Sequence, residues 1–198
     1  MDYLKMKILK TDNLAPDENV IDEAIDVLAN GGVIMYPTDT VYGLGANIFD
    51  NKAVRNVFKI KQRNLLKPLS ILVSDTDAIE LVARISNYQK DTLDKYLPGP
   101  YTFILNKRTI VPRVVTSGLT HVGVRVPENR IACGLARIFP ITTTSANLSD
   151  EEILSTPKEI LDQLGCDVDL VIDVGPLESK KPSTIVDLTT PQPTFIRR

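Results

Sequence analysis

Apolar and polar positions recur along the chain in two patterns, which predict helices and strands in alternation. Apolar residues spaced three or four apart predict helices over residues 17–30, 51–60, 76–84, 86–96, 129–138 and 157–164. Short apolar runs bounded by Pro, Gly or polar residues predict strands over residues 33–36, 70–73, 101–105, 122–126, 140–144, 169–173, 184–188 and 194–197. Helices and strands that alternate from end to end indicate an α/β fold, with helices packed against a largely buried sheet.

The connections between strands favour a mixed sheet. The strands expected over 101–105 and 122–126 are joined by a segment that contains Pro and Gly and shows no helical pattern. Such a connection is typical of antiparallel neighbours, whereas a purely parallel sheet needs a helical crossover after each strand. No internal repeat, low-complexity segment or linker interrupts the pattern. We therefore expect residues 1–198 to form a single-domain twisted mixed sheet with flanking helices.

Length and composition are those of a globular protein whose core is large enough to fold without disulfides or a structural metal. The 198 residues are 43% hydrophobic and 24% charged, and a chain of this size buries roughly 70% of its unfolded surface. No apolar run approaches the roughly 20 residues of a membrane span, and the N-terminus has no signal-peptide pattern. We expect a cytoplasmic protein with no membrane contact. The one histidine, His121, excludes sites that need two His ligands.

Charge is distributed unevenly, although the net charge is only −2. All charged residues from Asp12 to Asp26 are acidic, whereas all those from Lys52 to Lys67 are basic. A second stretch, from Lys95 to Arg125, also contains no carboxylate. Most charge runs are solvated faces. Two acid-free basic stretches in a mildly acidic chain also fit a local positive patch for an anion, and the sequence leaves both interpretations open.

The common catalytic and nucleotide motifs are absent. The sequence contains no GxxxxGK[ST] phosphate loop and no GxSxG elbow, and Gly43-Leu44-Gly45 lacks the third glycine of a dinucleotide fingerprint. What remains is a set of polar motifs at the ends of expected strands, where open α/β sheets place ligands.

Two of these motifs lie in the first third of the chain. Thr38-Asp39-Thr40 follows a buried strand and precedes a pair of glycines that allow close approach, although a capped turn would use the same residues. Lys61 and Arg63 follow a helix and, in an extended segment, would project to one side as a polyphosphate site. The plainer alternative is a basic helix end that complements the helix dipole.

Three further motifs lie towards the C-terminus. Thr142 to Ser149 is rich in hydroxyls that could bind an oxyanion, or form a strand and an N-capping turn. Ser183, just before a strand, is equally consistent with an ordinary turn. Arg125 lies in a strand rich in Val, where a charged side chain must find a partner or face a cleft.

Together, and in this order, the motifs resemble the YrdC-like threonylcarbamoyl-AMP synthase family in its short, single-domain form. The matching segments are GGVIMYPTDTVYGLGA, KQR with KPL, LPGPYTFIL, VGVRVP, TTSANLS, STIVD and FIRR. They cover nearly the whole chain, and the combination is far more specific than any one motif.

The resemblance implies a positively charged concave cleft and a nucleotidyltransferase activity. The expected reaction makes L-threonylcarbamoyladenylate from L-threonine, bicarbonate and ATP, releases pyrophosphate, and supplies a downstream transferase complex that modifies tRNA. Position by position, the ATP-binding residues would be Lys61, Arg63, Lys67, Ser145, Asn147 and Arg197. The threonine-binding residues would be Thr38, Thr40, Arg125, Thr143 and Ser183. No protein nucleophile or base is required. Mg²⁺ is expected to accompany ATP, with Asp39 as the nearest candidate ligand.

Three departures from the family pattern concern the site and the C-terminus. Asn64 replaces a common Pro, and Leu72 occupies the region where longer relatives place a threonine-contacting His. The chain also ends at Arg198, before the usual Pro-Gly, and we expect no appended C-terminal domain.

Two alternative functions remain. An RNA-binding or RNA-processing factor could use the same basic cleft without making an adenylate, through contacts with tRNA or double-stranded RNA, although only 6% of residues are aromatic. A carbamoyl-transfer domain of the same fold is disfavoured because the chain has no CxxC motif.

Overall fold

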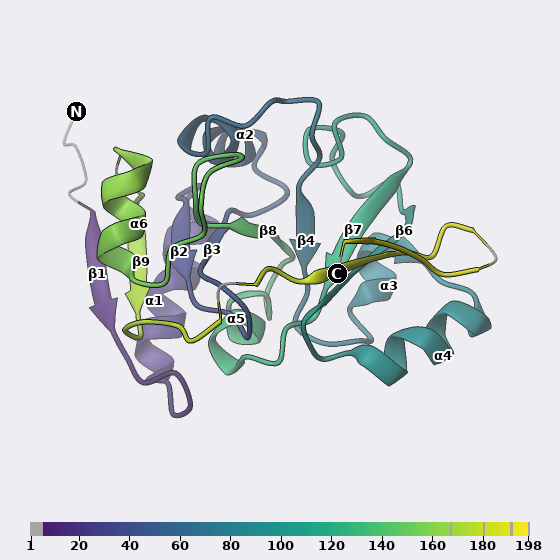
Figure 1. The fold of residues 1–198 in the computed structure, drawn as a ribbon, viewed down its shortest axis with the longest axis horizontal. Coiled ribbons are helices and arrows are strands. Elements are labelled where there is room, and N and C mark those ends of the chain that lie inside the picture. Colours follow the sequence, from purple (N-terminus) through teal and green to yellow (C-terminus); the bar gives the residue numbers. More distant parts are fainter. Residues whose placement is uncertain (1–5, 167, 180, 191, 198) are drawn as a thin grey trace.

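The protein is a layered α/β structure built on one mixed sheet (Figure 1). The computed structural model describes residues 6–166, 168–179, 181–190 and 192–197, and only the backbone of Arg197. Within these residues there are six helices: α1 (Glu18–Ala29), α2 (Asn51–Ile60), α3 (Ile79–Val82), α4 (Asn87–Tyr96), α5 (Arg130–Leu135) and α6 (Pro157–Leu164). None of these helices is long and apolar enough to cross a membrane.

The described residues contribute eleven strands to the sheet. They are β1 (Lys7–Lys10), β2 (Ile34–Tyr36), β3 (Gly43–Gly45), β4 (Ser70–Leu72), β5 (Ala83–Arg84), β6 (Tyr101–Lys107), β7 (His121–Arg125), β8 (Ile141–Ser145), β9 (Leu170–Asp173), β10 (Thr184–Asp187) and β11 (Thr194–Arg197). Their order is β1-β9-β2-β3-β8-β4-β7-β6-β10-β11, and β5 pairs with β6. The sheet contains both parallel pairs, such as β4 with β7, and antiparallel pairs, such as β6 with β7. The expected mixed sheet with flanking helices is confirmed.

Three strands depart from the pattern-based expectation. Strand β1 is short and mostly exposed, so it carries no clear apolar run. Strand β3 is Gly-Leu-Gly, and an added Cβ at Gly45 would lie 2.9 Å from the Tyr36 ring, so close packing explains the glycine. The helix expected over 76–84 contains only α3, because Ala83 and Arg84 leave it to pair with β6.

The helices cover the two faces of the sheet unequally. One face packs Val54, Phe58 and other apolar residues of α2, α3, α4 and α6 into the larger core cluster. The other face is covered by α1 and α5 alone, through residues such as Leu28 and Leu135. Side chains alternate between faces along a strand, so the polar residues of β4, β6, β7 and β8 emerge on this second face. The uncovered part of that face carries the candidate site.

Candidate active site

A pocket opens on the uncovered sheet face, lined by residues from loops and strands far apart in the sequence. Among its lining residues are Thr38, Arg63, Ser70, Thr102, Arg125, Thr143, Ser145 and Ser183. Six of the predicted site residues are in this group: four of the five predicted for threonine, and Arg63 and Ser145 of the six predicted for ATP. Lys61, Asn147 and Thr40 contact the pocket residues from behind, and Lys67 lies at the exposed rim.

The segment after β2 is a tight turn organised by the Thr38 hydroxyl. This buried hydroxyl donates to the Val41 carbonyl at 2.7 Å and accepts the amides of Thr40 and Val41 at 3.1 and 3.2 Å. The turn interpretation of this motif is confirmed, and because Thr38 also lines the pocket, its role in ligand binding stays a prediction. At its base, the Tyr36 hydroxyl donates to Thr143 at 3.0 Å, and burial raises the pKa of Tyr36 to about 12.

Arg125 is the most constrained charged side chain in the pocket. It ends β7, is 5% exposed, and forms a buried ion pair through Nη2 with Asp39 Oδ1. The same nitrogen donates to Thr40 Oγ1 at 2.7 Å. Its Nε is buried and has no hydrogen-bond partner among the described residues. A buried unpaired donor costs roughly 1–3 kcal/mol. Because Arg125 also lines the pocket, its guanidinium is suited to an anionic ligand there.

Lys61 is buried at the end of α2 and holds the loop after β8. Its ammonium is 1% exposed and donates to the carbonyls of Ser145 and Asn147, the latter at 2.6 Å, and to Asn147 Oδ1 at 3.2 Å. Burial lowers the pKa of Lys61 to about 7, with Arg63 adding to the shift and Asp150 opposing it. Three acceptors match the three N–H groups of the charged ammonium.

The sequence predicted an extended segment from Lys61 to Arg63, and this prediction is wrong. Gln62 adopts a left-handed conformation with φ of 49°, and the Arg63 amide returns to the Phe58 carbonyl at 2.8 Å to close the helix end. This turn sends the Lys61 side chain into the protein while Arg63 lines the pocket. The spacing of apolar residues does not indicate which non-glycine residue adopts a left-handed conformation, so the sequence could not predict this turn.

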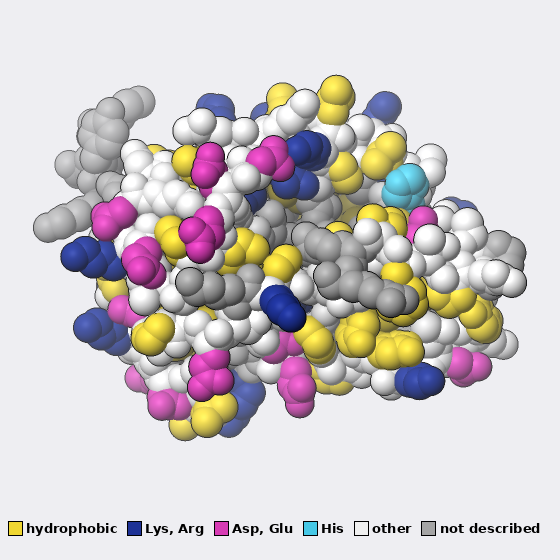
Figure 2. Space-filling model, viewed as in Figure 1, with side chains coloured by type: hydrophobic (Ala, Val, Ile, Leu, Met, Phe, Trp, Pro, Cys, Tyr) yellow, Lys and Arg dark blue, Asp and Glu magenta, His cyan; other side chains and the backbone are white. Residues whose placement is uncertain are grey.

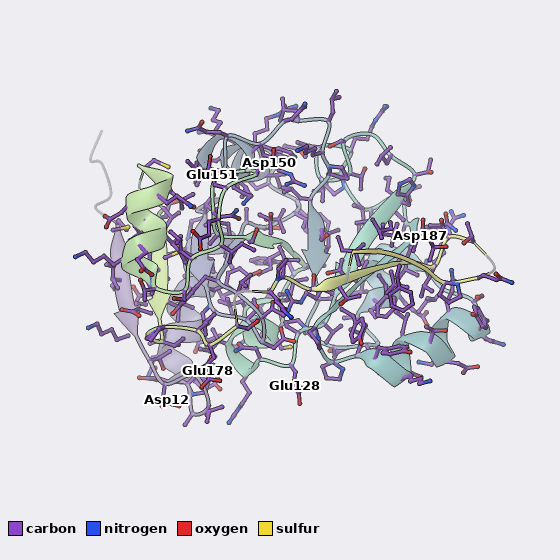
Figure 3. All side chains as sticks on the ribbon, viewed as in Figure 1. Asp12, Glu128, Asp150, Glu151, Glu178 and Asp187 are labelled. Carbon is purple, nitrogen blue, oxygen red and sulfur yellow. The ribbon has the colours of Figure 1, made fainter. Side chains whose placement is uncertain are left out.

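Arg63 and Lys67 have partners that the sequence did not reveal. The Arg63 guanidinium donates to the carbonyls of Lys67 at 3.0 Å and Pro68 at 2.8 Å, and burial lowers its pKa from the ordinary value. Lys67 forms an exposed ion pair with Asp150 at 3.0 Å. Figure 3 labels Asp150 and Glu151 near α2, and Figure 2 shows acidic and basic side chains meeting there. The rim of the site therefore carries both signs of charge.

Asn147 is fully engaged inside its own loop. Its Oδ1 accepts from Ser145 Oγ at 2.6 Å as well as from Lys61, and its Nδ2 donates to Leu148 and Glu151 carbonyls at 2.8 Å. The predicted role of Asn147 in holding ATP stays a prediction. In this structure its amide fixes the shape of the loop.

Ser183 reaches the pocket from the segment between β9 and β10, which crosses the front of the sheet in Figure 1. Its hydroxyl lies 2.7 Å from that of Thr102, and both are buried. Sequence reasoning missed Thr102 and Ser70. Side chains alternate between the two faces of β6, and Tyr101, Phe103 and Leu105 pack on the face opposite Thr102, so this alternation could have identified Thr102. The side chain of Arg197, a predicted ATP ligand, lies outside the described residues, and its backbone pairs with Ile185 of the pocket.

The site does not fit a metal ion at Asp39. Oδ1 of that carboxylate pairs with Arg125, and Oδ2 accepts the Glu128 amide at 3.2 Å. No group of three or more His, Cys, Asp or Glu suited to a metal occurs in the described part of the chain. The expected Mg²⁺ stays a prediction, without a ligand set from these residues.

Comparison with known proteins gives consistent matches over nearly the whole chain. A family model named Sua5/YciO/YrdC and described as "Telomere recombination" matches residues 26–198. A Methanocaldococcus jannaschii protein, provisionally named threonylcarbamoyl-AMP synthase, is 41% identical over 187 residues, which cover 93% of this chain and 89% of that protein. A Pyrococcus abyssi threonylcarbamoyl-AMP synthase is 34% identical over 88% of this chain and 52% of its own length.

Two solved structures have the same fold. The crystal structure of Pyrococcus abyssi Sua5 complexed with L-threonine matches with a TM-score of 0.89 at 32% identity, covering 98% of this chain and 57% of that one. Escherichia coli YciO matches with a TM-score of 0.86 at 33% identity, covering 98% and 95% of the two chains. The chain therefore spans little more than half of Pyrococcus abyssi Sua5 and nearly all of Escherichia coli YciO.

Proposed function

This chain belongs to the Sua5/YciO/YrdC family, and from this premise we propose that it makes L-threonylcarbamoyladenylate from L-threonine, bicarbonate and ATP. The observation that carries the proposal is the unpaired, buried Nε of Arg125 in a pocket surrounded by hydroxyls. An arginine can bind a carboxylate through charge-assisted hydrogen bonds. The relatives named as synthases and the Sua5 complex with L-threonine support the same substrate.

The residues divide the pocket into two ends. Arg125 and the hydroxyls of Thr102, Thr143 and Ser183 would hold the carboxylate, hydroxyl and amine of L-threonine. Arg63, with the loop from Ser145 that Lys61 holds, would take the phosphates of ATP. Lys67 and Arg197 are proposed to extend this phosphate end at the rim.

The chemistry needs positioning more than a reactive side chain. The threonine amine attacks bicarbonate and expels water, forming an N-carboxylate. An oxygen of this carboxylate attacks the α-phosphorus of ATP, and the bond to pyrophosphate breaks. Arg63 would stabilise the charge that develops on the phosphate oxygens, and Arg125 would hold the substrate in line. No described side chain is assigned as nucleophile or base.

The proposal also includes a cytoplasmic location and delivery of the adenylate to a transferase complex that modifies tRNA. Direct contact with tRNA stays a prediction.

Pyrophosphate release is the experiment that tests this function. With ATP, L-threonine and bicarbonate all present, we expect stoichiometric pyrophosphate and threonylcarbamoyladenylate, measured by a coupled assay and mass spectrometry. Omission of L-threonine or bicarbonate should reduce release to background. A protein that only binds RNA, or that carbamoylates another substrate, would release no pyrophosphate in a threonine-dependent way.

Amino-acid selectivity gives a second prediction. L-Serine keeps the hydroxyl but lacks a methyl group, so its kcat/KM should fall by about 10- to 200-fold. L-Valine keeps the shape but leaves the pocket hydroxyls unpaired, and its kcat/KM should fall more than about a thousandfold. Steady-state kinetics with the three amino acids provide the comparison. Equal turnover of serine and valine would contradict a site that recognises the hydroxyl.

A further inference from the structure

Asp39 lies directly behind the pocket and contacts its central arginine. Its side chain is 11% exposed, and it is not among the residues that line the pocket. One carboxylate oxygen pairs with Arg125 Nη2, and the other accepts the backbone amide of Glu128 at 3.2 Å. Asp39 thus links the guanidinium at the end of β7 to the start of the segment that leads into α5.

We propose that Asp39 is a positioning residue for the substrate: it fixes the Arg125 guanidinium so that its remaining N–H groups, on Nε and Nη1, are available to the carboxylate of L-threonine. The inference rests on the proposed function. Both Nη2 hydrogens have internal acceptors, one on Asp39 and one on Thr40 Oγ1 at 2.7 Å, and no described residue accepts from the buried Nε. The N–H groups of Nε and Nη1 therefore remain for a ligand. The two acceptors determine the plane of the guanidinium, and the ligand completes its hydrogen bonding.

If Asp39 acted only through its charge, it would weaken the binding of L-threonine, whereas a positioning role strengthens it. A carboxylate beside Arg125 lowers the positive potential at the pocket, and it therefore weakens attraction for the carboxylate of a substrate. If charge alone mattered, loss of the Asp39 charge would strengthen threonine binding. If orientation matters, the same loss releases a long, flexible arginine and weakens binding. The sign of the change separates the two roles.

Two variants of Asp39 test the inference, with Glu128→Gln as the matched control. Asp39→Asn removes the charge at nearly constant shape, and Asp39→Glu keeps the charge but moves it by one methylene. Glu128→Gln also removes one negative charge nearby, but only the backbone amide of Glu128 contacts Asp39, and Figure 3 shows its side chain pointing away from the protein. Calorimetric titration gives the Kd for L-threonine and, separately, for ATP.

We expect both Asp39 variants to bind L-threonine about 10- to 100-fold more weakly, because small displacements of a positioning group have effects of this size. Their ATP affinity should stay within about twofold of wild type, which also reports an intact fold. Glu128→Gln should bind both ligands normally. Threonine binding that is unchanged or tighter in Asp39→Asn or in Asp39→Glu overturns the inference, and so does an equal loss of threonine and ATP binding.

The wild-type protein distinguishes failure of this inference from failure of the proposed function. If wild type releases pyrophosphate with L-threonine while the Asp39 variants bind threonine normally, the inference alone is wrong. If wild type neither binds L-threonine nor releases pyrophosphate, the proposed function fails, and the inference fails with it.

Discussion

Arg125→Lys should lower kcat/KM for L-threonine by about a hundredfold, within the 2–5 kcal/mol typical of a buried charged contact. Lysine keeps a positive charge opposite Asp39, so the buried carboxylate retains a partner and the fold should survive. It cannot supply the planar guanidinium or the Nε donor that is unpaired in the pocket. Steady-state kinetics at saturating ATP, with L-threonine varied, measure the effect.

The ATP Kd of Arg125→Lys serves as its internal control. It should match the wild-type value, because Arg63 and Lys61 at the phosphate end are unaltered. Full threonine turnover in Arg125→Lys would show that Nε does not hold the substrate, and the assignment of the carboxylate site would have to be abandoned.

Lys61→Met should destabilise the protein by about 1–3 kcal/mol, since it leaves the buried Asn147 carbonyl without a donor, whereas the Ser145 carbonyl and Asn147 Oδ1 keep the Asn147 amide and the Ser145 hydroxyl. For a chain of this size, such a loss lowers the melting temperature by roughly 2–12 °C. The loop from Ser145 to Asn147 loses its anchor, so ATP affinity should fall more than about tenfold. Lys67→Met is the matched control for stability alone, because its ion pair with Asp150 is exposed and contributes about 0–1 kcal/mol.

Lys61 also predicts how stability and nucleotide binding depend on pH. Its pKa is about 7 in the folded protein, below the ordinary 10.5, because of burial and the neighbouring Arg63, against the opposing effect of Asp150. Between these values the unfolded chain binds more protons, so the stability of the nucleotide-free protein should rise with pH from about 7 to about 10. Phosphates favour the charged ammonium, so ATP affinity should fall over the same interval.

Melting temperature and ATP Kd between pH 6 and pH 9 check this behaviour. Lys61→Met should lose the pH dependence that Lys61 contributes, while the titration of ATP itself remains in both proteins. Identical pH profiles for wild type and Lys61→Met would show that Lys61 does not titrate in this range.

The sequence predicted those helices and strands in which apolar residues recur at a regular spacing. Helix α2 and the strands around Arg125 follow directly from the spacing of apolar residues. Arg125 itself could be identified because a charge in a Val-rich strand needs a cleft or a partner. The partner Asp39 could not, since the two residues are 86 positions apart and pairing across that distance leaves no local pattern.

The interior of the site depended on features without a sequence period. Lys61 was expected beside the phosphates, but the left-handed Gln62 turns it inward, and the burial of its ammonium depends on carbonyls from residues 145 and 147. Strand β3 was hidden because two of its three residues are glycine, which adds nothing to an apolar pattern. In both cases tertiary contacts, not local preferences, decide the structure.

The order of strands in the sheet has a consequence for biosynthesis. Strands β1 and β2, near the N-terminus, both pair with β9, and β10 supplies the parallel partner of β6. Pairing between segments so distant in sequence requires the closure of a long loop, and the entropy lost in that closure slows folding. Strand β9 can pair with β1 and β2, and Ser183 can enter the pocket, only after most of the chain has been translated. An emerging chain therefore exposes β1 without a partner strand until β9 is translated, and the pocket lacks its full lining until Ser183 has been added.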